Sequence, residues 1–265
     1  MDIALVAMAM FRAKMHYFIH TQDSGLTGKT SDSFWRYAAV VHKRLEVFVV
    51  KKSDKVAVFN PDYAVKIKSI NPAAEGYPTW YDPALRREKT ERRARSILWI
   101  GRLEVPKDPI LALRTFEELL KKDPDSGWEL TMLGSGTLLE NARRTLKSMP
   151  SSVQAAADIR GRVSPDAVAE AIALSGIFLM TSHPGYEGYP RVLVEAMSMG
   201  AQPVVTKGSD TGALIRNGVN GFMAESRQPA ELATLCLAAT DLDREVVVQT
   251  VESFSAPAMV AAILS

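Results

Sequence analysis

From residue 96 to residue 240 the chain alternates between short apolar runs and segments whose apolar residues recur at helical spacing. Strands that alternate with helices through short loops are typical of a doubly wound α/β domain with a parallel sheet. The predicted strands are 96–101, 128–134, 153–161, 176–182 and 201–206, with 218–223 as a turn into a further short strand. The predicted helices are 108–122, 137–149, 164–175, 190–199 and 228–240.

Ligands of such sheets bind beyond the carboxyl ends of the strands. We therefore expect functional residues in the loops 101–108, 134–137, 160–164 and 182–190.

The first 95 residues are less regular. They predict a strand at 15–20, a long helix at 31–53 and a strand at 55–60. The segment 71–83 contains too many chain-breaking residues for a regular element and predicts a connection between domains. These strands are too few for a complete open sheet.

The composition is that of an ordinary globular protein, with 47% hydrophobic and 23% charged residues in 265. The single cysteine, Cys236, excludes an intramolecular disulfide and fits a reducing compartment; we expect it to be buried. No apolar run is long enough to span a membrane, and the acid at position 2 argues against a signal peptide, which predicts a cytoplasmic protein. The front part of the chain (1–95) is basic and the back part (96–265) is mildly acidic. Much of the basic excess lies in 86–96, which is either a solvated face or an anion-binding patch.

Two glycine-containing segments look like phosphate loops but do not fit. "DSGLTGKT" (23–30) has Asp23 where a Walker A loop needs glycine, so a carboxylate would face the phosphate. "LGSGTLLE" (133–140) has Leu139 where a dinucleotide fingerprint needs its third glycine. A contact of this second turn with phosphate or sugar stays open.

The stretch "HPGYEGYPRVLVEAMSMGAQPVV" (183–205) joins a predicted strand to a predicted helix. Gly185 and Gly188 allow the backbone to approach a ligand closely, and Pro190 suits the first turn of the helix. The amides of 188–192 then form a helix N-terminus, which favours phosphate. Glu195, about one and a half turns into the helix, can accept hydrogen bonds from paired hydroxyls, and Glu187 lies at the mouth of the site.

This stretch resembles the signature of the retaining glycosyltransferases of family 4, which have the GT-B fold and an E-x7-E motif. Other segments are similar in the same order: "ILWIGRLEVPKDP", "LTMLGSGTLLE", "IRGRVSPDAVAEAIALSGIFLMTSHPGYEG" and "NGVNGFM". The resemblance covers about 96 to 240. It implies a complete C-terminal Rossmann-like doubly wound parallel sheet at 96–242 and an incomplete N-terminal, acceptor-side portion at 1–82. A linker (83–95) would join them, and a C-terminal tail (243–265) would return toward the N-terminal portion.

The resemblance also implies roles for individual residues. Arg102 and Lys107 match the basic pair on the donor diphosphate, although Asp108 stands where the family usually has glycine. Glu195 matches the acid on the ribose hydroxyls, and Glu187 the acid near the transferred sugar. "YFIHTQ" resembles the strand whose histidine, here His20, faces that sugar; a capped or packed histidine is the alternative. The remaining expected donor contacts are Gly134, Gly136, Gly161, Arg162, Val163, Gly188, Tyr189, Pro190, Arg191 and Val192.

The implied reaction moves a sugar from a nucleoside-diphosphate sugar to an acceptor hydroxyl with retention of configuration, without cofactor or metal. The acceptor would be a carbohydrate, a lipid or a small molecule, with peripheral membrane association through the basic front part and no nucleic-acid partner. Because the front part resembles only the last portion of an acceptor domain, two alternatives stay open. One is a non-catalytic nucleotide-sugar-binding module of the same fold, and the other is a different Rossmann-like enzyme.

Overall fold

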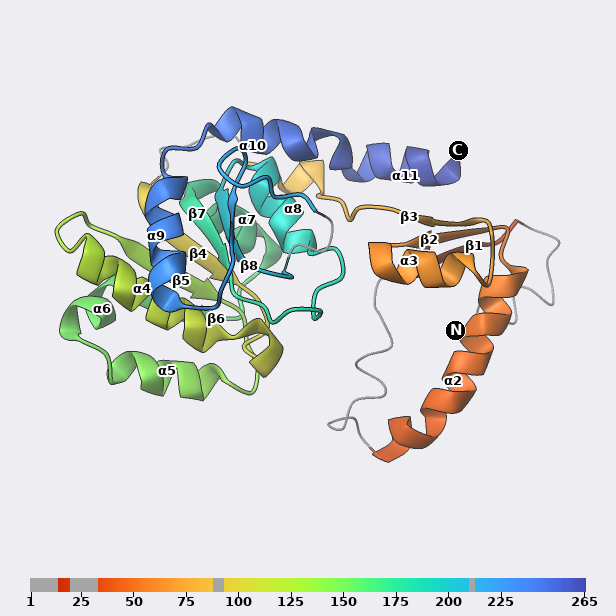
Figure 1. The fold of residues 1–265 in the computed structure, drawn as a ribbon, viewed down its shortest axis with the longest axis horizontal. Coiled ribbons are helices and arrows are strands. Elements are labelled where there is room, and N and C mark those ends of the chain that lie inside the picture. The colour runs from red at the N-terminus through yellow and green to blue at the C-terminus, as the bar shows by residue number, and fades with distance from the viewer. Residues whose placement is uncertain (1–13, 20–32, 88–92, 210–212) are drawn as a thin grey trace. The chain divides into compact units, whose positions relative to one another are not determined.

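The computed structural model describes residues 14–19, 33–87, 93–209 and 213–265; within α2, side chains are not described at 33–40 and 42 (Figure 1). The chain divides into two compact units, one of residues 1–78 with 262–265 and one of residues 79–261. His20, expected to face the donor sugar, lies outside the described residues. Each unit is built around a parallel sheet.

The smaller unit has a sheet of order β1-β2-β3, with parallel strands His16–Ile19, Lys55–Val58 and Ala74–Gly76. Helix α2 (Ser33–Lys52) follows β1, and α3 (Pro61–Lys68) begins at Asn60, whose side chain accepts a hydrogen bond from the Tyr63 amide. Strand β3 corrects the prediction that 71–83 holds no regular element. Its backbone pairs with β2, so pairing with a neighbour outweighs the poor local propensity.

The larger unit has a sheet of order β6-β5-β4-β7-β8-β9, with every described pair of neighbours parallel. Its strands are β4 (Arg93–Ile100), β5 (Glu129–Leu133), β6 (Ala157–Gly161), β7 (Ser175–Met180), β8 (Gln202–Thr206) and β9 (Phe222–Ala224). Successive strands move outward from β4 to β6, and the chain then returns to pair β7 with the other side of β4. This reversal is a topological switch point, beside which α/β sheets form their ligand crevice.

Helices cover both faces of this sheet (Figure 1). They are α4 (Pro109–Lys122), α5 (Leu139–Lys147), α6 (Ser151–Ala156), α7 (Pro165–Leu174), α8 (Arg191–Ser198), α9 (Pro229–Ala239) and α10 (Arg244–Val251). Helix α11 (Ala256–Leu264) follows at the end of the chain, and its last residues belong to the smaller unit. Short 3-10 turns lie at Pro83–Leu85, Val105–Lys107 and Glu252–Phe254. Alternate strand residues point to opposite faces. Ile97 and Trp99 of β4 thus join a core with α4 and α9, whereas Leu98 joins a core with α7, α8 and α10.

Most predicted elements of this unit are confirmed to within a few residues. The segment 153–161 was predicted as one strand, but α6 ends at Ala156 and β6 begins at Ala157. Pro150 stands at the N-cap and starts a helical turn that the alanines continue, which explains the difference. Cys236 is confirmed as fully buried in the core, and burial raises the pKa of its thiol to about 12.

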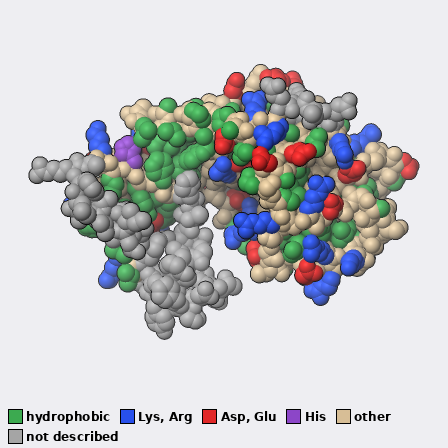
Figure 2. All heavy atoms as spheres, turned by 180° about the vertical axis from the view of Figure 1, so that it is seen from behind, with side chains coloured by type: hydrophobic (Ala, Val, Ile, Leu, Met, Phe, Trp, Pro, Cys, Tyr) green, Lys and Arg blue, Asp and Glu red, His purple; other side chains and the backbone are tan. Residues whose placement is uncertain are grey.

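Two of the four described arginines of the basic segment 86–96 bond to carboxylates on the surface. Arg87 lies 2.6 Å from Asp166, and Arg93 lies 2.7 Å from Glu129. On the face drawn in Figure 2, Lys and Arg side chains of the larger unit are interspersed with Asp and Glu. These pairs favour the solvated-surface interpretation of the segment; peripheral membrane association stays a prediction. No helix in the described part of the chain has both the length and the apolar character needed to cross a membrane.

Candidate functional site

Three loops meet at the carboxyl ends of β4, β5 and β6. Gly101 donates its amide to the Leu133 carbonyl, and the Leu103 amide donates to the Ser135 carbonyl. The Gly134 amide donates to the Gly161 carbonyl at 2.7 Å. These backbone bonds hold the three loops against one another.

The glycines of the turn after β5 are required by space. A Cβ atom on Gly134 would lie 1.9 Å from the Gly101 carbonyl oxygen, and one on Gly136 would lie 2.5 Å from the Leu103 carbonyl oxygen. Gly134 also has a positive φ of 135°, which L side chains rarely adopt. Gly134 and Gly136 therefore have a structural role, because they allow the loop after β5 to approach the loop after β4 closely.

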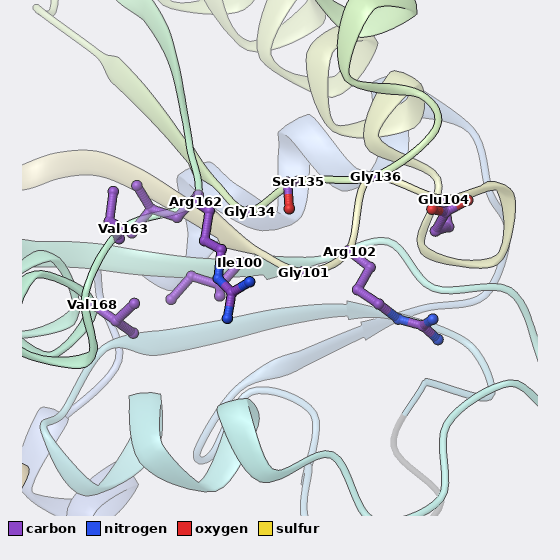
Figure 3. A pocket seen from close by; sticks show the side chains of 11 residues that line it. Ile100, Gly101, Arg102, Glu104, Gly134, Ser135, Gly136, Arg162, Val163 and Val168 are labelled. Atoms are coloured by element: carbon purple, nitrogen blue, oxygen red, sulfur yellow. The ribbon is translucent and has the colours of Figure 1, made fainter.

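These loops line a pocket of about 550 Å³ (Figure 3). Ile100, Leu133, Val163 and Val168 supply an apolar wall, while Arg102, Glu104 and Arg162 supply charge. Arg102 and Arg162 lie on either side of Gly101 in Figure 3, and their side chains extend toward the same side. Glu104 faces the turn after β5: it accepts the Thr137 amide at 2.9 Å and the Thr137 hydroxyl at 2.5 Å, and these bonds lower the pKa of the Glu104 carboxyl.

The structure brings together Lys107 and Glu187, two residues that were both expected at the donor site. The Lys107 Nζ atom lies 2.5 Å from Glu187 Oε1, with the two side chains only 14% and 10% exposed. The Ser182 hydroxyl donates to the same carboxylate oxygen at 2.5 Å. The loop after β4 and the loop after β7 are thus joined by a buried ion pair at the switch point.

Two residues that reinforce this junction were not predicted. Asp108, directly after Lys107, has a left-handed backbone with φ of 46°, the conformation for which glycine is favoured. Its carboxylate caps α4 by accepting the Leu111 amide, and it also bonds to Arg227 at 2.6 Å. Arg227 donates further to the carbonyls of Ser182 and Thr181 at 2.8 and 3.1 Å. The departure from glycine at position 108 was visible in the sequence, whereas its partner in the segment before α9 was not.

The helix that follows the loop begins at Arg191, with Pro190 as its N-cap; this corrects the prediction that places Pro190 in the first turn. No side chain in the described part of the chain caps this N-terminus, so a ligand can accept hydrogen bonds from its first amides. The preceding Tyr189 packs edge-on against Phe254.

Glu195 lies one turn into α8, where Arg191 Nε donates to its carboxylate at 2.8 Å. Burial raises the pKa of Glu195, while Arg191 acts against that rise. Glu195 lines a small cavity with Tyr81 and Asp82, and Val168 lines both this cavity and the larger pocket. Nine of the expected site residues of the larger unit therefore fall into two adjoining parts. Arg102, Gly134, Gly136, Arg162 and Val163 line the pocket, whereas Lys107 with Glu187 and Arg191 with Glu195 are paired beside it.

Among the described residues no three His, Cys, Asp or Glu side chains are grouped to hold a metal ion. The site instead offers paired charges, backbone amides and an apolar pocket, which suit a ligand with an anionic group and a flat apolar part.

A family model described as "Glycosyl transferases group 1" matches residues 94–241. D-inositol 3-phosphate glycosyltransferase of Rhodococcus jostii (strain RHA1) is 25% identical over 141 residues, which are 52% of this chain and 31% of the relative. The chain thus spans about a third of the length of this curated relative.

Solved structures share the fold at low sequence identity. HepE of Anabaena, in complex with UDP and glucose, superposes with a TM-score of 0.72 at 15% identity, covering 98% of this chain and 73% of HepE. The pneumococcal O-GlcNAc transferase GtfA, in complex with UDP and GlcNAc, gives a TM-score of 0.68 at 15% identity, covering 98% of this chain and 52% of GtfA.

The two parallel sheets define an α/β protein with a GT-B-like fold. The family match covers more than half of the sequence, and the chain belongs to the group 1 glycosyltransferases. The resemblance inferred from the sequence is thereby confirmed.

Proposed function

We propose that this protein binds a nucleoside-diphosphate sugar in the larger unit and transfers the sugar to an acceptor hydroxyl with retention of configuration. The observation that supports this most directly is the buried Lys107–Glu187 pair beside Arg102, at the switch point of the sheet. Charge develops on the leaving diphosphate during sugar transfer, and fixed cations and helix amides stabilise such charge. Lys107, Arg102 and the N-terminus of α8 are the groups that would do so.

The remaining contacts follow the shape of such a donor. The pocket beside Arg162 and Val163 would hold the base, and Glu195 would accept hydrogen bonds from ribose hydroxyls. Glu187 would face the transferred sugar. UDP is the first nucleotide to test, because HepE and GtfA bind it.

The binding part of the proposal is tested by titration calorimetry with UDP, GDP and ADP. Replacing Arg102 and Lys107 together by alanine removes two charge-assisted contacts, and we expect the affinity for the best nucleotide to fall about 100-fold or more. Arg143→Ala, which removes an exposed arginine paired with Glu140 on α5, should leave the affinity unchanged. Nucleotide binding that is equal in all three proteins would contradict the proposed donor site.

The catalytic part is tested by Glu187→Gln. This change removes the negative charge paired with Lys107 and leaves the lysine available to phosphate, so nucleotide affinity should not fall, whereas donor hydrolysis or transfer should drop by orders of magnitude. Glu129→Gln alters an exposed carboxylate at the start of β5 and serves as the control. A wild-type protein that binds the nucleotide but releases no sugar would support the non-catalytic binding module instead.

A further inference from the structure

Tyr186 lies in a tight turn whose sequence determines its geometry. "HPGY" (183–186) places Pro184 and Gly185 at the two central positions, Gly185 has a φ of 75°, and the Tyr186 amide donates to the His183 carbonyl at 3.2 Å. Proline followed by a glycine with positive φ is the pattern of a type II turn. The turn directs the tyrosine that precedes Glu187 in the loop after β7.

Both ends of this turn are held by neighbouring loops. The His183 amide donates to the Pro106 carbonyl at 2.7 Å, which ties the turn to the segment that carries Lys107. Pro184 packs closely on Gly208: a Cβ atom added to Gly208 would lie 3.0 Å from the Pro184 Cα atom. These two contacts hold the backbone of the turn beside the segment that carries Lys107.

The side chain of Tyr186 contacts both cations assigned to the diphosphate. Its hydroxyl accepts a hydrogen bond from Arg102 Nη2, and Lys107 Nζ lies 5.7 Å from the centre of its ring. The two cations differ in their bonded partners: Lys107 is paired with the carboxylate of Glu187, whereas Arg102 bonds to a neutral hydroxyl and interacts with the Glu104 carboxylate only through space. Tyr186 therefore orients the Arg102 guanidinium without cancelling its charge.

A phenol oxygen that accepts a hydrogen bond still has its own proton to donate. Beside an arginine and a lysine, that proton is placed for an oxygen of an anionic ligand, and hydrogen bonds to charged acceptors are the stronger kind. We infer that Tyr186 is a third ligand of the donor diphosphate: its hydroxyl accepts from Arg102 and donates to a phosphate oxygen. This inference rests on the proposed function.

Tyr186→Phe tests the inference because it removes the hydroxyl and keeps the ring against Lys107. Titration calorimetry would use the tightest of UDP, GDP and ADP together with the corresponding monophosphate. We expect the affinity for the diphosphate to fall about tenfold and the affinity for the monophosphate to fall less, so that the ratio of diphosphate affinity to monophosphate affinity decreases. Tyr186→Ala, which also removes the ring, should weaken diphosphate binding further.

Tyr77→Phe is the matched control, since the Tyr77 hydroxyl also bonds to a charged side chain, that of Glu75 in the smaller unit. Its nucleotide affinities should equal those of the wild type. If Tyr186→Phe lost the same factor of affinity for diphosphate and for monophosphate, or lost no more affinity for diphosphate than the control, the role of Tyr186 would be overturned. Tighter diphosphate binding by Tyr186→Phe would also overturn it, because the tyrosine would then compete with the ligand. A wild-type protein that binds none of the three diphosphates would refute the proposed function itself, and this inference with it.

Discussion

The contact between Arg227 and Asp108 allows a quantitative prediction about what holds the site together. Arg227→Met removes a guanidinium that bonds to the Asp108 carboxylate and to the carbonyls of Ser182 and Thr181. Removing one partner of a fully buried ion pair costs about 3–5 kcal/mol. Both side chains are 26% exposed, and the Ser182 carbonyl also accepts from the Thr206 hydroxyl at 2.6 Å. Water and Thr206 therefore replace part of the loss, and we expect destabilisation of about 2–3 kcal/mol.

The measurement is guanidinium denaturation followed by tryptophan fluorescence, since Trp99 and Trp128 are buried in the larger unit. A loss of this size corresponds to a decrease in Tm of about 5–10 °C for a unit of this length. Lys121→Met removes an exposed lysine that bonds to Glu118 on α4 and is the control; it should cost less than about 0.5 kcal/mol.

The partner substitution shows whether the two residues act together. Asp108→Gly relieves a left-handed backbone that costs an aspartate about 1 kcal/mol, but it removes the cap of α4 and leaves Arg227 without its carboxylate. In the double variant no unpaired charge is left, so the combined destabilisation should be smaller than the sum by at least about 1 kcal/mol. Additive effects, or an Arg227→Met protein as stable as the control, would refute the reasoning.

Two further predictions concern the loop after β5 and the helix α8. Gly134→Ala should destabilise the larger unit by about 3 kcal/mol or more in the same assay and abolish nucleotide binding, because the new Cβ atom would clash with the Gly101 carbonyl. The control is Gly127→Ala: Gly127 has a φ of 71° and open space where the Cβ would lie, so this change should cost only about 1 kcal/mol. Burial raises the pKa of Glu195, so the folded state keeps this proton at a pH where the unfolded state has lost it. The stability of the wild type relative to Glu195→Gln should therefore fall as pH rises from the ordinary glutamate pKa through the raised one. The measurement is the denaturation midpoint of both proteins at a series of pH values. A difference between the two midpoints that is the same at every pH would contradict this.

The strands and most helices of the larger unit could be predicted because their signals are local. A continuous apolar run such as 176–182 predicts a strand buried on both faces, and Ser164 followed by Pro165 predicts where α7 begins. Pairing of distant segments carries no such signal. Strand β3 is three residues long and exists through its partner β2, and Arg227 is 119 residues from the Asp108 carboxylate that it binds. The unusual backbone of Asp108 could be suspected only because its neighbour Lys107 matched a family motif.

The charged pairs of the site differ in how a ligand can use them. Arg191 is 55% exposed, and its bond to Glu195 spans one helical turn, so the pair contributes little to stability and ribose hydroxyls can displace the arginine at small cost. Lys107 and Glu187 are almost fully buried, and the Ser182 hydroxyl also donates to the Glu187 carboxylate, so separating the pair would leave a charge unpaired in a low-dielectric environment. A diphosphate must then bind to a Lys107 that keeps its carboxylate. Further positive charge would come from Arg102, which bonds to the neutral hydroxyl of Tyr186, and from Arg162, which lines the same pocket. The site thus has one pair that a ligand can separate, one buried pair that it cannot, and one arginine bonded to a neutral hydroxyl. This division follows from burial and from the bonded partners, and it could not be derived from the motif.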